Sequence, residues 1–327
     1  MKKQILIVGS GFAGMWAAVS AARLADLTGS DDLQITVLAP RPELRIRPRF
    51  YEEQVATFAA PLSDLFAELN VHFIAGTAER IDVKQKSVWY RDSQGNVTLI
   101  AYDRLIVATG SQTRRPAIPG LAEFAFDIDQ LESAQHFENH LDSLATRPST
   151  PERNTVVVCG GGFTGIELAT ELPARLRARF GDDTQTKVIV VERGSVIGGR
   201  YSEELRGTIE EASLALGVEW RLNSEISAID PHGVTLKNGE RIAAATVVWT
   251  AGVEAHPLSQ QIAGERDGQG RLVVTENLQV PAHPEVYATG DMAHARTDDL
   301  GNTALMTCQH AIQLGKFAGH NAAASLL

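Results

Sequence analysis

The sequence predicts an α/β protein built from two copies of one strand–turn–helix unit. The first copy, at residues 5–25, reads ILIVGSGFAGMWAAVSAARLA, and the second, at 156–176, reads VVVCGGGFTGIELATELPARL. In each copy a β-branched run leads into GxGxxG, and apolar residues then recur at helical spacing. A further apolar run follows each helix, at 33–39 and at 187–192, so each half forms a βαβ unit with a buried parallel sheet.

The composition is that of an ordinary globular protein. The 327 residues suffice for two domains at about 100–200 residues each, with 44% hydrophobic and 21% charged residues. Lys plus Arg total 30 and Asp plus Glu total 40, which gives a net charge of −10 and argues against general nucleic-acid binding. The only cysteines, Cys159 and Cys308, exclude a disulfide framework, a CxxC redox pair and a cysteine-rich zinc site, and we expect no metal.

The first 24 residues superficially resemble a signal peptide, because two lysines precede an apolar stretch. Three glycines at GxGxxG spacing interrupt that stretch, so we expect a strand, a turn and a helix there, in a cytoplasmic protein. No apolar run reaches the roughly 18 residues that a membrane-spanning helix needs.

Weaker signals describe the rest of the chain. Alternating strands are expected at 86–91 and 97–101, and a long helix at 303–325. The Pro- and Arg-rich stretch 113–120 predicts a linker, and a second crossing between domains is expected near 256–257.

The two glycine motifs predict dinucleotide binding. In a βαβ unit the first Gly permits the tight turn, the second lets the backbone approach a pyrophosphate, and the third lets helix and strand pack closely. The helix N-terminus then offers free N–H groups and a partial positive charge to the phosphates. The motif glycines are Gly9, Gly11 and Gly14 in the first copy and Gly160, Gly162 and Gly165 in the second.

An acidic residue at the end of the second strand is expected to hold the adenosine ribose. In the second copy it is Glu192, which favours NADH over NADPH, although the neighbouring Arg193 weakens that preference. In the first copy the position is occupied by Ala39. Either the backbone holds the ribose there, or Arg41 or Glu43 substitutes.

The chain resembles the flavoproteins with two dinucleotide-binding domains, and most of all the type II, non-proton-pumping NADH dehydrogenases. The motifs that carry the resemblance are GSGFAG (9–14), LIVATGS (105–111), VCGGGFTGIELATEL (158–172), VVWTAGV (247–253), VYATGDMA (286–293) and TCQHAIQLGKFAGHN (307–321). The resemblance implies two Rossmann-like domains, with FAD on the first site and NADH on the second. It further implies that the NAD(H) domain, 117–255, is inserted in a discontinuous FAD domain made of 1–116 and 256–327 with its terminal helix.

The resemblance also identifies cofactor-binding positions. Around the turns they are Gly9, Gly11, Phe12, Ala13, Gly14, Ala108, Thr109 and Gly110 for FAD, and Gly160, Gly162, Phe163, Thr164, Gly165, Glu192, Arg193 and Gly252 for NADH. Gly290 ends a short strand and brings backbone close to the cofactor, and Asp291 resembles the carboxylate that holds the flavin ribityl hydroxyls. An ordinary turn aspartate is the alternative interpretation.

Three residues are catalytic candidates by the same resemblance. Gln309 and Gln313 share one helix face and match the glutamines where quinone meets flavin. The helix N-terminus beside them would stabilise an anionic reduced flavin. Glu167 matches a glutamate near nicotinamide and flavin. The alternatives are two solvated glutamines and a carboxylate that favours a helix N-terminus.

The arginine-rich stretch RPELRIRPRF follows the second strand of the first half. Such a charge run is usually a solvated face. In the resembled family this loop passes over the flavin, so Pro48 is a candidate for contact with the ring. Arg41 and the other arginines are candidates for the FAD phosphates or for steering an anionic acceptor.

These observations predict an FAD-dependent NAD(P)H dehydrogenase that passes hydride from NADH to FAD and two electrons to an acceptor, which we expect to be a quinone. NADPH remains an alternative donor. The alternatives are an NAD(P)H-dependent flavoprotein reductase for a ferredoxin, nitro or aromatic acceptor, and a non-catalytic NADH sensor. Type II enzymes continue beyond the terminal helix with membrane-binding amphipathic segments, so peripheral contact with the inner face of the cell membrane is expected only if such a segment follows Leu327. A homodimer is left open.

Overall fold

The computed structural model describes residues 2–182, 184–199 and 201–327, and the chain folds into two compact units. Unit 1 consists of the chain up to Arg45, Ala59–Gln112 and Val253–Leu327, and unit 2 consists of Ile46–Phe58 and Thr113–Gly252. The chain therefore passes between the units at four places, of which the last, at 252–253, lies a few residues before the crossing expected at 256–257.

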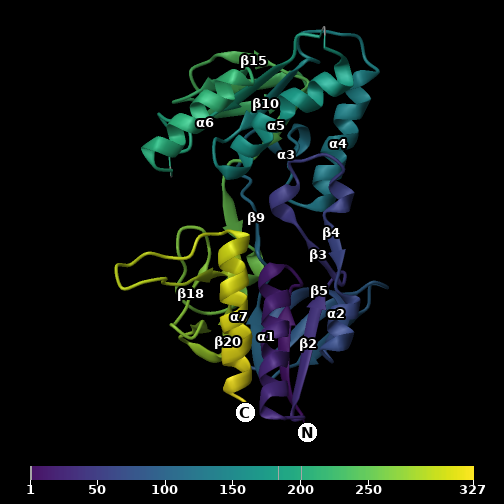
Figure 1. The fold of residues 1–327 in the computed structure, drawn as a ribbon, viewed down its shortest axis with the longest axis vertical. Coiled ribbons are helices and arrows are strands. Elements are labelled where there is room, and N and C mark those ends of the chain that lie inside the picture. The colour runs from purple at the N-terminus through teal and green to yellow at the C-terminus, as the bar shows by residue number, and fades with distance from the viewer. Residues whose placement is uncertain (1, 183, 200) are drawn as a thin grey trace. The chain divides into compact units, whose positions relative to one another are not determined.

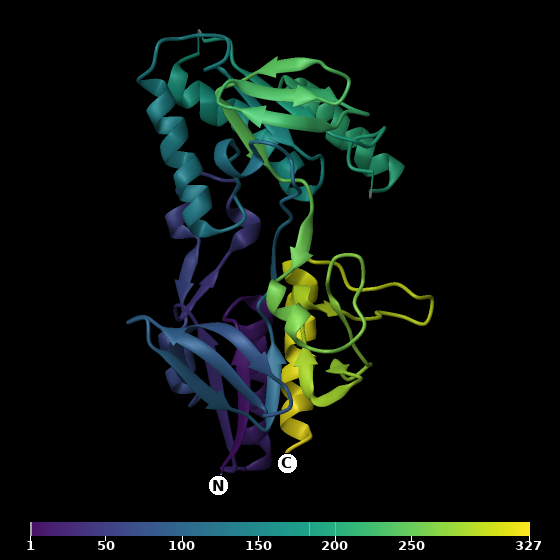
Figure 2. The ribbon, with the colours of Figure 1, turned by 180° about the vertical axis from the view of Figure 1, so that it is seen from behind.

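Unit 1 is built on an eight-stranded sheet with the order β19-β20-β8-β1-β2-β5-β6-β7. The strands are β1 (Lys3–Val8), β2 (Leu33–Ala39), β5 (His72–Asp82), β6 (Ser87–Asp92), β7 (Val97–Ala101), β8 (Arg104–Val107), β19 (Gln279–Val280) and β20 (His283–Ala288). The five strands β5-β2-β1-β8-β20 pair in parallel, which is the strand order of a Rossmann-like domain. The strands β5, β6 and β7 form the antiparallel meander drawn as wide blue arrows in Figure 2.

Two long helices of unit 1, α1 (Phe12–Thr28) and α7 (Cys308–Ala324), lie side by side in Figures 1 and 2. Their close approach depends on glycine, since a Cβ at Gly315 would lie 2.4 Å from the carbonyl oxygen of Ala13, and one at Gly319 would lie 2.0 Å from that of Ala17. The two glycines that interrupt the predicted helix at 303–325 are therefore packing sites.

Unit 2 contains a four-stranded parallel sheet of order β12-β11-β10-β16 and a three-stranded antiparallel sheet of order β13-β14-β15. The strands are β10 (Thr155–Cys159), β11 (Lys187–Val191), β12 (Val218–Arg221), β13 (Ile226–Asp230), β14 (Gly233–Leu236), β15 (Arg241–Ala243) and β16 (Thr246–Trp249). The helices are α3 (Leu121–Phe124), α4 (Leu131–Ala145), α5 (Phe163–Phe180) and α6 (Glu203–Ala215). Buried apolar residues of the two sheets, among them Val157, Ile189 and Val234, form one core.

The segment Ile46–Phe58, which we call the strap, leaves unit 1 and belongs to unit 2. It is carried by an antiparallel pair in unit 1, β3 (Glu43–Arg45) and β4 (Ala59–Pro61), and holds two 3-10 turns, Arg47–Arg49 and Val55–Thr57. The FAD segment expected at 1–116 includes these residues, because chain continuity alone gives no sign that the chain leaves unit 1 and returns to it.

The remaining elements are short. They are α2 (Ser63–Glu68), β9 (Ser111–Thr113), β17 (Val253–Ala255), β18 (Leu272–Val273), β21 (Ala293–His294) and the 3-10 turns Pro257–Gln261 and Gly290–Met292. In the part of the chain that the structure describes, none of the helices has the length and apolar character needed to cross a bilayer.

Candidate functional site

The strands of unit 1 end together at one edge of its sheet. Val8 at the end of β1 pairs with Leu38 of β2 and Val107 of β8, and Val107 pairs with Ala288 of β20. Because these strands are parallel, the segments that follow them, including Ala108–Gly110 and Gly290–Asp291, emerge at that same edge. This is the edge at which open α/β sheets bind their ligands.

The first glycine turn is fixed by close backbone contacts. Gly9 has a φ of +110°, and a Cβ on it would lie 2.4 Å from the carbonyl oxygen of Ala108. A Cβ on Gly14 would lie 1.9 Å from the carbonyl oxygen of Gly9. The first and third glycines therefore serve the turn and the helix packing, as the motif requires.

The second glycine of this turn, Gly11, faces open space, since a Cβ on it would meet no described atom within 4 Å. Gly11 is the N-cap of α1, no side chain caps the helix, and its first turn carries no acidic residue. The first helical bond runs from the N–H of Met15 to the carbonyl of Gly11 at 2.9 Å, so the preceding N–H groups have no acceptor within the helix. A bare cradle of N–H groups at a helix N-terminus fits a pyrophosphate.

Asp291 is held beside this edge. The Ser111 hydroxyl donates to its Oδ2 at 2.7 Å, which ties the segment after β8 to the segment after β20. Gly290 has a φ of +60°, and a Cβ there would lie 2.8 Å from the Cβ of Ala13 on α1. The structure therefore brings Asp291, the 108–110 segment and the first glycine turn together.

The glycine turn of unit 2 has the same construction. Gly160 has a φ of +112° and lies against Ala251, and a Cβ on Gly165 would lie 1.9 Å from the carbonyl oxygen of Gly160. A Cβ on Gly162, the uncapped N-cap of α5, would again meet nothing within 4 Å. The second turn therefore also fits a pyrophosphate.

Glu192 is bound directly to this turn. Its two carboxylate oxygens accept the N–H of Gly161 at 2.6 Å and the N–H of Gly194 at 2.7 Å. The adjacent Arg193 is exposed, and Gly252, with a φ of +87°, follows β16 at the same sheet edge. A carboxylate oriented by two backbone donors keeps lone pairs for sugar hydroxyls and repels a phosphate.

Glu167 lies on the second turn of α5, half-buried, within a group of strap and loop residues. Burial, and after it the negative charge of Glu52 on the strap, raise the pKa of Glu167. Burial and then the charge of Glu167 raise the pKa of Tyr201, whose ring meets Phe163 edge-on at 5.0 Å between centroids. Glu167 is thus a carboxyl group whose environment favours its protonated form.

Gln309 and Gln313 are both exposed on α7. The helix begins at its N-cap Thr307, whose hydroxyl accepts the N–H of His310. Cys308 donates to the side-chain oxygen of Gln309 at 3.3 Å, whereas Cys159 is buried in β10, which raises the pKa of its thiol to about 12. Both cysteines are free, so neither forms a redox pair.

The arginine-rich stretch divides between the units. Arg41 lies in unit 1 near the first turn, where the Ser10 hydroxyl donates to the carbonyls of Arg41 at 3.3 Å and Glu43 at 3.1 Å. Glu43 pairs with Arg45 at 2.9 Å, and Pro48 is exposed on the strap and belongs to unit 2. The structure thus groups Arg41 with the first glycine turn, and a contact of Pro48 with the flavin stays a prediction.

Several residues that support the turns were missed by the sequence analysis. Ser10 and Ser111 fix neighbouring segments in unit 1, and in unit 2 the Thr250 hydroxyl donates to the carbonyls of Cys159 at 3.0 Å and Gly160 at 3.1 Å. Thr250 directly follows β16, Ser10 follows β1 after one residue, and Ser111 follows β8 after three residues. A polar residue just past a buried strand was therefore a usable signal.

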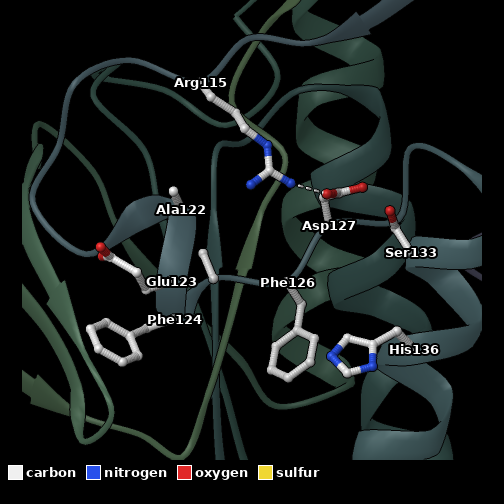
Figure 3. A pocket seen from close by; sticks show the side chains of 9 residues that line it. Arg115, Ala122, Glu123, Phe124, Phe126, Asp127, Ser133 and His136 are labelled. Atoms are coloured by element: carbon white, nitrogen blue, oxygen red, sulfur yellow. Dashed lines mark hydrogen bonds and ion pairs between the residues drawn. The ribbon is translucent and has the colours of Figure 1, made fainter.

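Unit 2 also contains a shallow hollow of about 260 Å³ (Figure 3). An ion pair between Arg115 and Asp127 lies at one side of it, and the rings of Phe126 and His136 lie together at 5.3 Å between centroids. None of the predicted site residues lines this hollow, so the glycine turns, and not this hollow, define the candidate site.

Two glycine-turn βαβ units in one chain, each with a bare cradle, define the class of oxidoreductases that bind two dinucleotides. The chain belongs to the pyridine nucleotide-disulphide oxidoreductase family, whose sequence pattern matches residues 3–315.

The chain is also similar to individual proteins. It is 41% identical to an NADH dehydrogenase-like protein of Mycobacterium tuberculosis, over 97% of this chain and 79% of that protein. It is 29% identical to the demethylphylloquinone reductase NdbB of Synechocystis, over 99% of this chain and 80% of that protein. The solved structure of NDH2 from Plasmodium falciparum in complex with NADH matches with a TM-score of 0.78 and 19% identity, over 90% of this chain and 65% of that one.

These similarities confirm the predicted fold class and the resemblance to type II NADH dehydrogenases. They also confirm the predicted enzyme class, an FAD-dependent NAD(P)H dehydrogenase, and its cofactors FAD and NADH. The roles of the individual site residues and the domain boundaries stay predictions.

Proposed function

We propose that this protein is an NADH:quinone oxidoreductase in which unit 1 binds FAD and unit 2 binds NADH. The observation that carries the proposal is the pair of bare glycine cradles, one in each unit. The acceptor is argued from the relatives, since one of them is named a demethylphylloquinone reductase. Both cysteines are free, so a disulfide exchange at a cysteine pair of this chain is not part of the proposal.

Bound FAD supplies the electron chemistry, because a flavin accepts hydride from NADH and passes two electrons to a second substrate. The residues of unit 1 bind FAD and orient it. The N–H groups that begin α1 hold the pyrophosphate, and Asp291, fixed by Ser111, accepts hydrogen bonds from the ribityl hydroxyls. The N-terminus of α7 places a partial positive charge beside the site.

The residues of unit 2 select the donor. Glu192 accepts from the adenosine ribose and disfavours the 2′-phosphate of NADPH, while the N–H groups that begin α5 hold the pyrophosphate. Glu167 lies four residues beyond the cradle residue Phe163, near the nicotinamide, and its raised pKa equips it to hold a proton there.

Replacing Glu192 by Ala tests the donor site. We expect the Kd for NADH to rise about 10- to 100-fold, because one hydrogen bond to a carboxylate, worth about 1.5–3 kcal/mol, is lost. The Kd for NADPH should change less. Flavin reduction after rapid mixing of the oxidised protein with each nucleotide, over a range of concentrations, gives both Kd values. Glu219→Ala, on the neighbouring strand β12, is the matched control, and an unchanged NADH affinity in Glu192→Ala would remove Glu192 from the site.

Replacing Gln309 by Leu tests the acceptor site. Its amide is exposed at the start of α7, where it can donate to a quinone carbonyl. We expect reoxidation by a short-chain quinone to slow about tenfold, the value of one lost hydrogen bond, while reduction by NADH stays unchanged. Gln94→Leu, an exposed glutamine elsewhere in unit 1, is the control. Equal reoxidation rates in both variants would argue against a quinone at Gln309.

The same assay discriminates the acceptors. Reduced protein is mixed in turn with a short-chain quinone, a ferredoxin and a nitro compound, and the proposal predicts that the quinone reoxidises it fastest. Faster reoxidation by ferredoxin would replace the proposed acceptor. Cytoplasmic location, membrane contact and a homodimer remain predictions that this assay does not address.

A further inference from the structure

The strap is bound to unit 2 along its length by charged contacts. Near its start, Arg47 forms an ion pair with Asp129, and its Nε donates to the Asp129 carbonyl at 3.1 Å. Near its end, the N–H of Gln54 donates to Glu138 on α4 at 2.6 Å. The apolar side chain of Phe50, only 1% exposed, anchors the middle. The strap therefore has its own docking contacts.

Arg175 on α5 binds the strap from inside unit 2. Only 2% of its side chain is exposed, and its Nη1 donates to the carbonyl of Tyr51 at 2.7 Å. Its Nε lies 3.8 Å from a carboxylate oxygen of Glu53, which also pairs with Arg179 one helical turn further on. The guanidinium lies over the ring of Phe137 at 5.6 Å. One buried cation thus connects α5 and α4 to the strap.

Burying the Arg175 guanidinium at this position costs more folding free energy than burying an apolar side chain there. Nε and Nη2 of Arg175 are buried and have no hydrogen-bond partner among the described residues. A buried, half-satisfied guanidinium is often less stabilising than an apolar side chain of similar volume. Its use here indicates a role in fixing the strap rather than in filling the core.

The docked strap carries two residues to Glu167. Glu52 is held by Arg49 through two hydrogen bonds of 2.6 and 2.5 Å, and its charge helps to raise the pKa of Glu167. The pKa of Tyr51 is raised by burial and then by the charge of Glu167. Tyr51 and Glu52 directly precede Glu53, the residue that Arg175 and Arg179 approach, so release of the strap would remove both from Glu167.

We infer that Arg175 is a positioning residue of the NADH half-reaction, which fixes the strap to α5 so that Tyr51 and Glu52 stay beside Glu167. The inference rests on the proposed function, in which Glu167 lies near the nicotinamide. Among the described residues, the titratable groups that interact electrostatically with Glu167 are Tyr51 and Glu52 on the strap and Tyr201 in the loop before α6.

Strap release is measured by trypsin cleavage of the flavin-loaded protein at the Arg49–Phe50 bond. Docking protects this bond, since Phe50 is buried. We expect cleavage to be roughly tenfold faster in Arg175→Lys, because the donor to the strap carbonyl is misplaced. Arg177→Lys, an exposed arginine on the same helix, should cleave like wild type. If Arg175→Lys fails to fold, Glu53→Gln removes the same attraction from the exposed side.

The pH dependence of flavin reduction by NADH separates positioning from mere stability. Burial and the charge of Glu52 both keep Glu167 protonated to higher pH, so strap release lowers its pKa. In Arg175→Lys and Glu53→Gln we expect the part of the pH profile that Glu167 controls, its limb, to move to lower pH, and the rate to fall about tenfold. NADH affinity, set at Glu192, should change less than about twofold. Glu52→Gln, which leaves the contacts of Arg175 intact, should move the limb in the same direction.

Wild-type cleavage rates and an unmoved pH limb in both strap variants would overturn the inference. Faster cleavage with an unmoved limb would overturn it as well, since Arg175 would then be structural only. If wild-type flavin is not reduced by NADH, the proposed function fails, and the positioning role fails with it. Trypsin would still report separately whether Arg175 binds the strap.

Discussion

Gly11→Val is expected to yield a folded protein without flavin. Gly11 has φ −66° and ψ −172°, an extended conformation that any residue adopts, and the added side chain would touch no described atom. The valine methyl groups would instead fill the space in front of the α1 N-terminus. A pyrophosphate excluded from that space loses two or more charge-assisted hydrogen bonds, about 3–6 kcal/mol, which weakens FAD binding by at least about a hundredfold.

The flavin absorbance per mole of purified chain measures this effect, and circular dichroism checks the fold. Gly268→Val is the matched control, because it lies in unit 1, a Cβ on it also meets nothing within 4 Å, and it is far along the chain from the turn. We expect Gly268→Val to keep its flavin. Full flavin occupancy in Gly11→Val would mean that FAD does not bind at the first glycine turn.

Gly162→Val is expected to have the opposite phenotype, a yellow protein that NADH reduces poorly. Gly162 has φ −80° and ψ −173°, and its Cβ position is equally open. Filling that space blocks the α5 N-terminus in unit 2 and leaves unit 1 unchanged. We expect the Kd for NADH to rise at least about a hundredfold, for the same loss of phosphate contacts.

The comparison of the two variants assigns the two sites. Gly207→Val, on the exposed side of α6, is the control for unit 2. Rapid mixing with NADH over a range of concentrations gives the Kd in each protein. A Gly162→Val protein that lost its flavin, or that kept wild-type NADH affinity, would show that the sites are assigned wrongly or that the second turn binds no nucleotide.

The sequence predicts the glycine turns and their neighbours well, because those features are local. The positive φ of Gly9 and Gly160 and the tight contacts of Gly14 and Gly165 follow from motif spacing alone. The hydrogen bonds of Glu192 to the second turn follow from its position at the end of a parallel strand. The expected strand at 33–39 coincides with β2.

Features that depend on contacts between residues far apart in the sequence could not be predicted from local motifs. Gly315 and Gly319 look like helix breakers, and their packing against α1 is decided by tertiary contact. Likewise, nothing local places Ile46–Phe58 with the second unit. The burial of Arg175 is only weakly indicated by the sequence, in which this charged residue interrupts the apolar helix face formed by Leu168, Leu172 and Leu176.

The sequence also leaves the first ribose site open between a backbone contact and a substitute side chain at Arg41 or Glu43. Ala39 is buried, and Glu43 is engaged by Arg45. The backbone of Arg41 and Glu43 is tied to the first turn through Ser10. Whether the backbone or a side chain such as that of Arg41 holds the adenosine ribose stays a prediction.

The central claim is that one chain binds FAD and NADH and passes electrons from the second to the first. Stopped-flow mixing of the purified yellow protein with NADH under anaerobic conditions tests it most directly. We expect rapid bleaching of the flavin absorbance with saturable dependence on NADH, slower or weaker reduction by NADPH, and return of the yellow colour when a short-chain quinone is added. Protein that contains no flavin, or flavin that NADH leaves oxidised, would contradict the account.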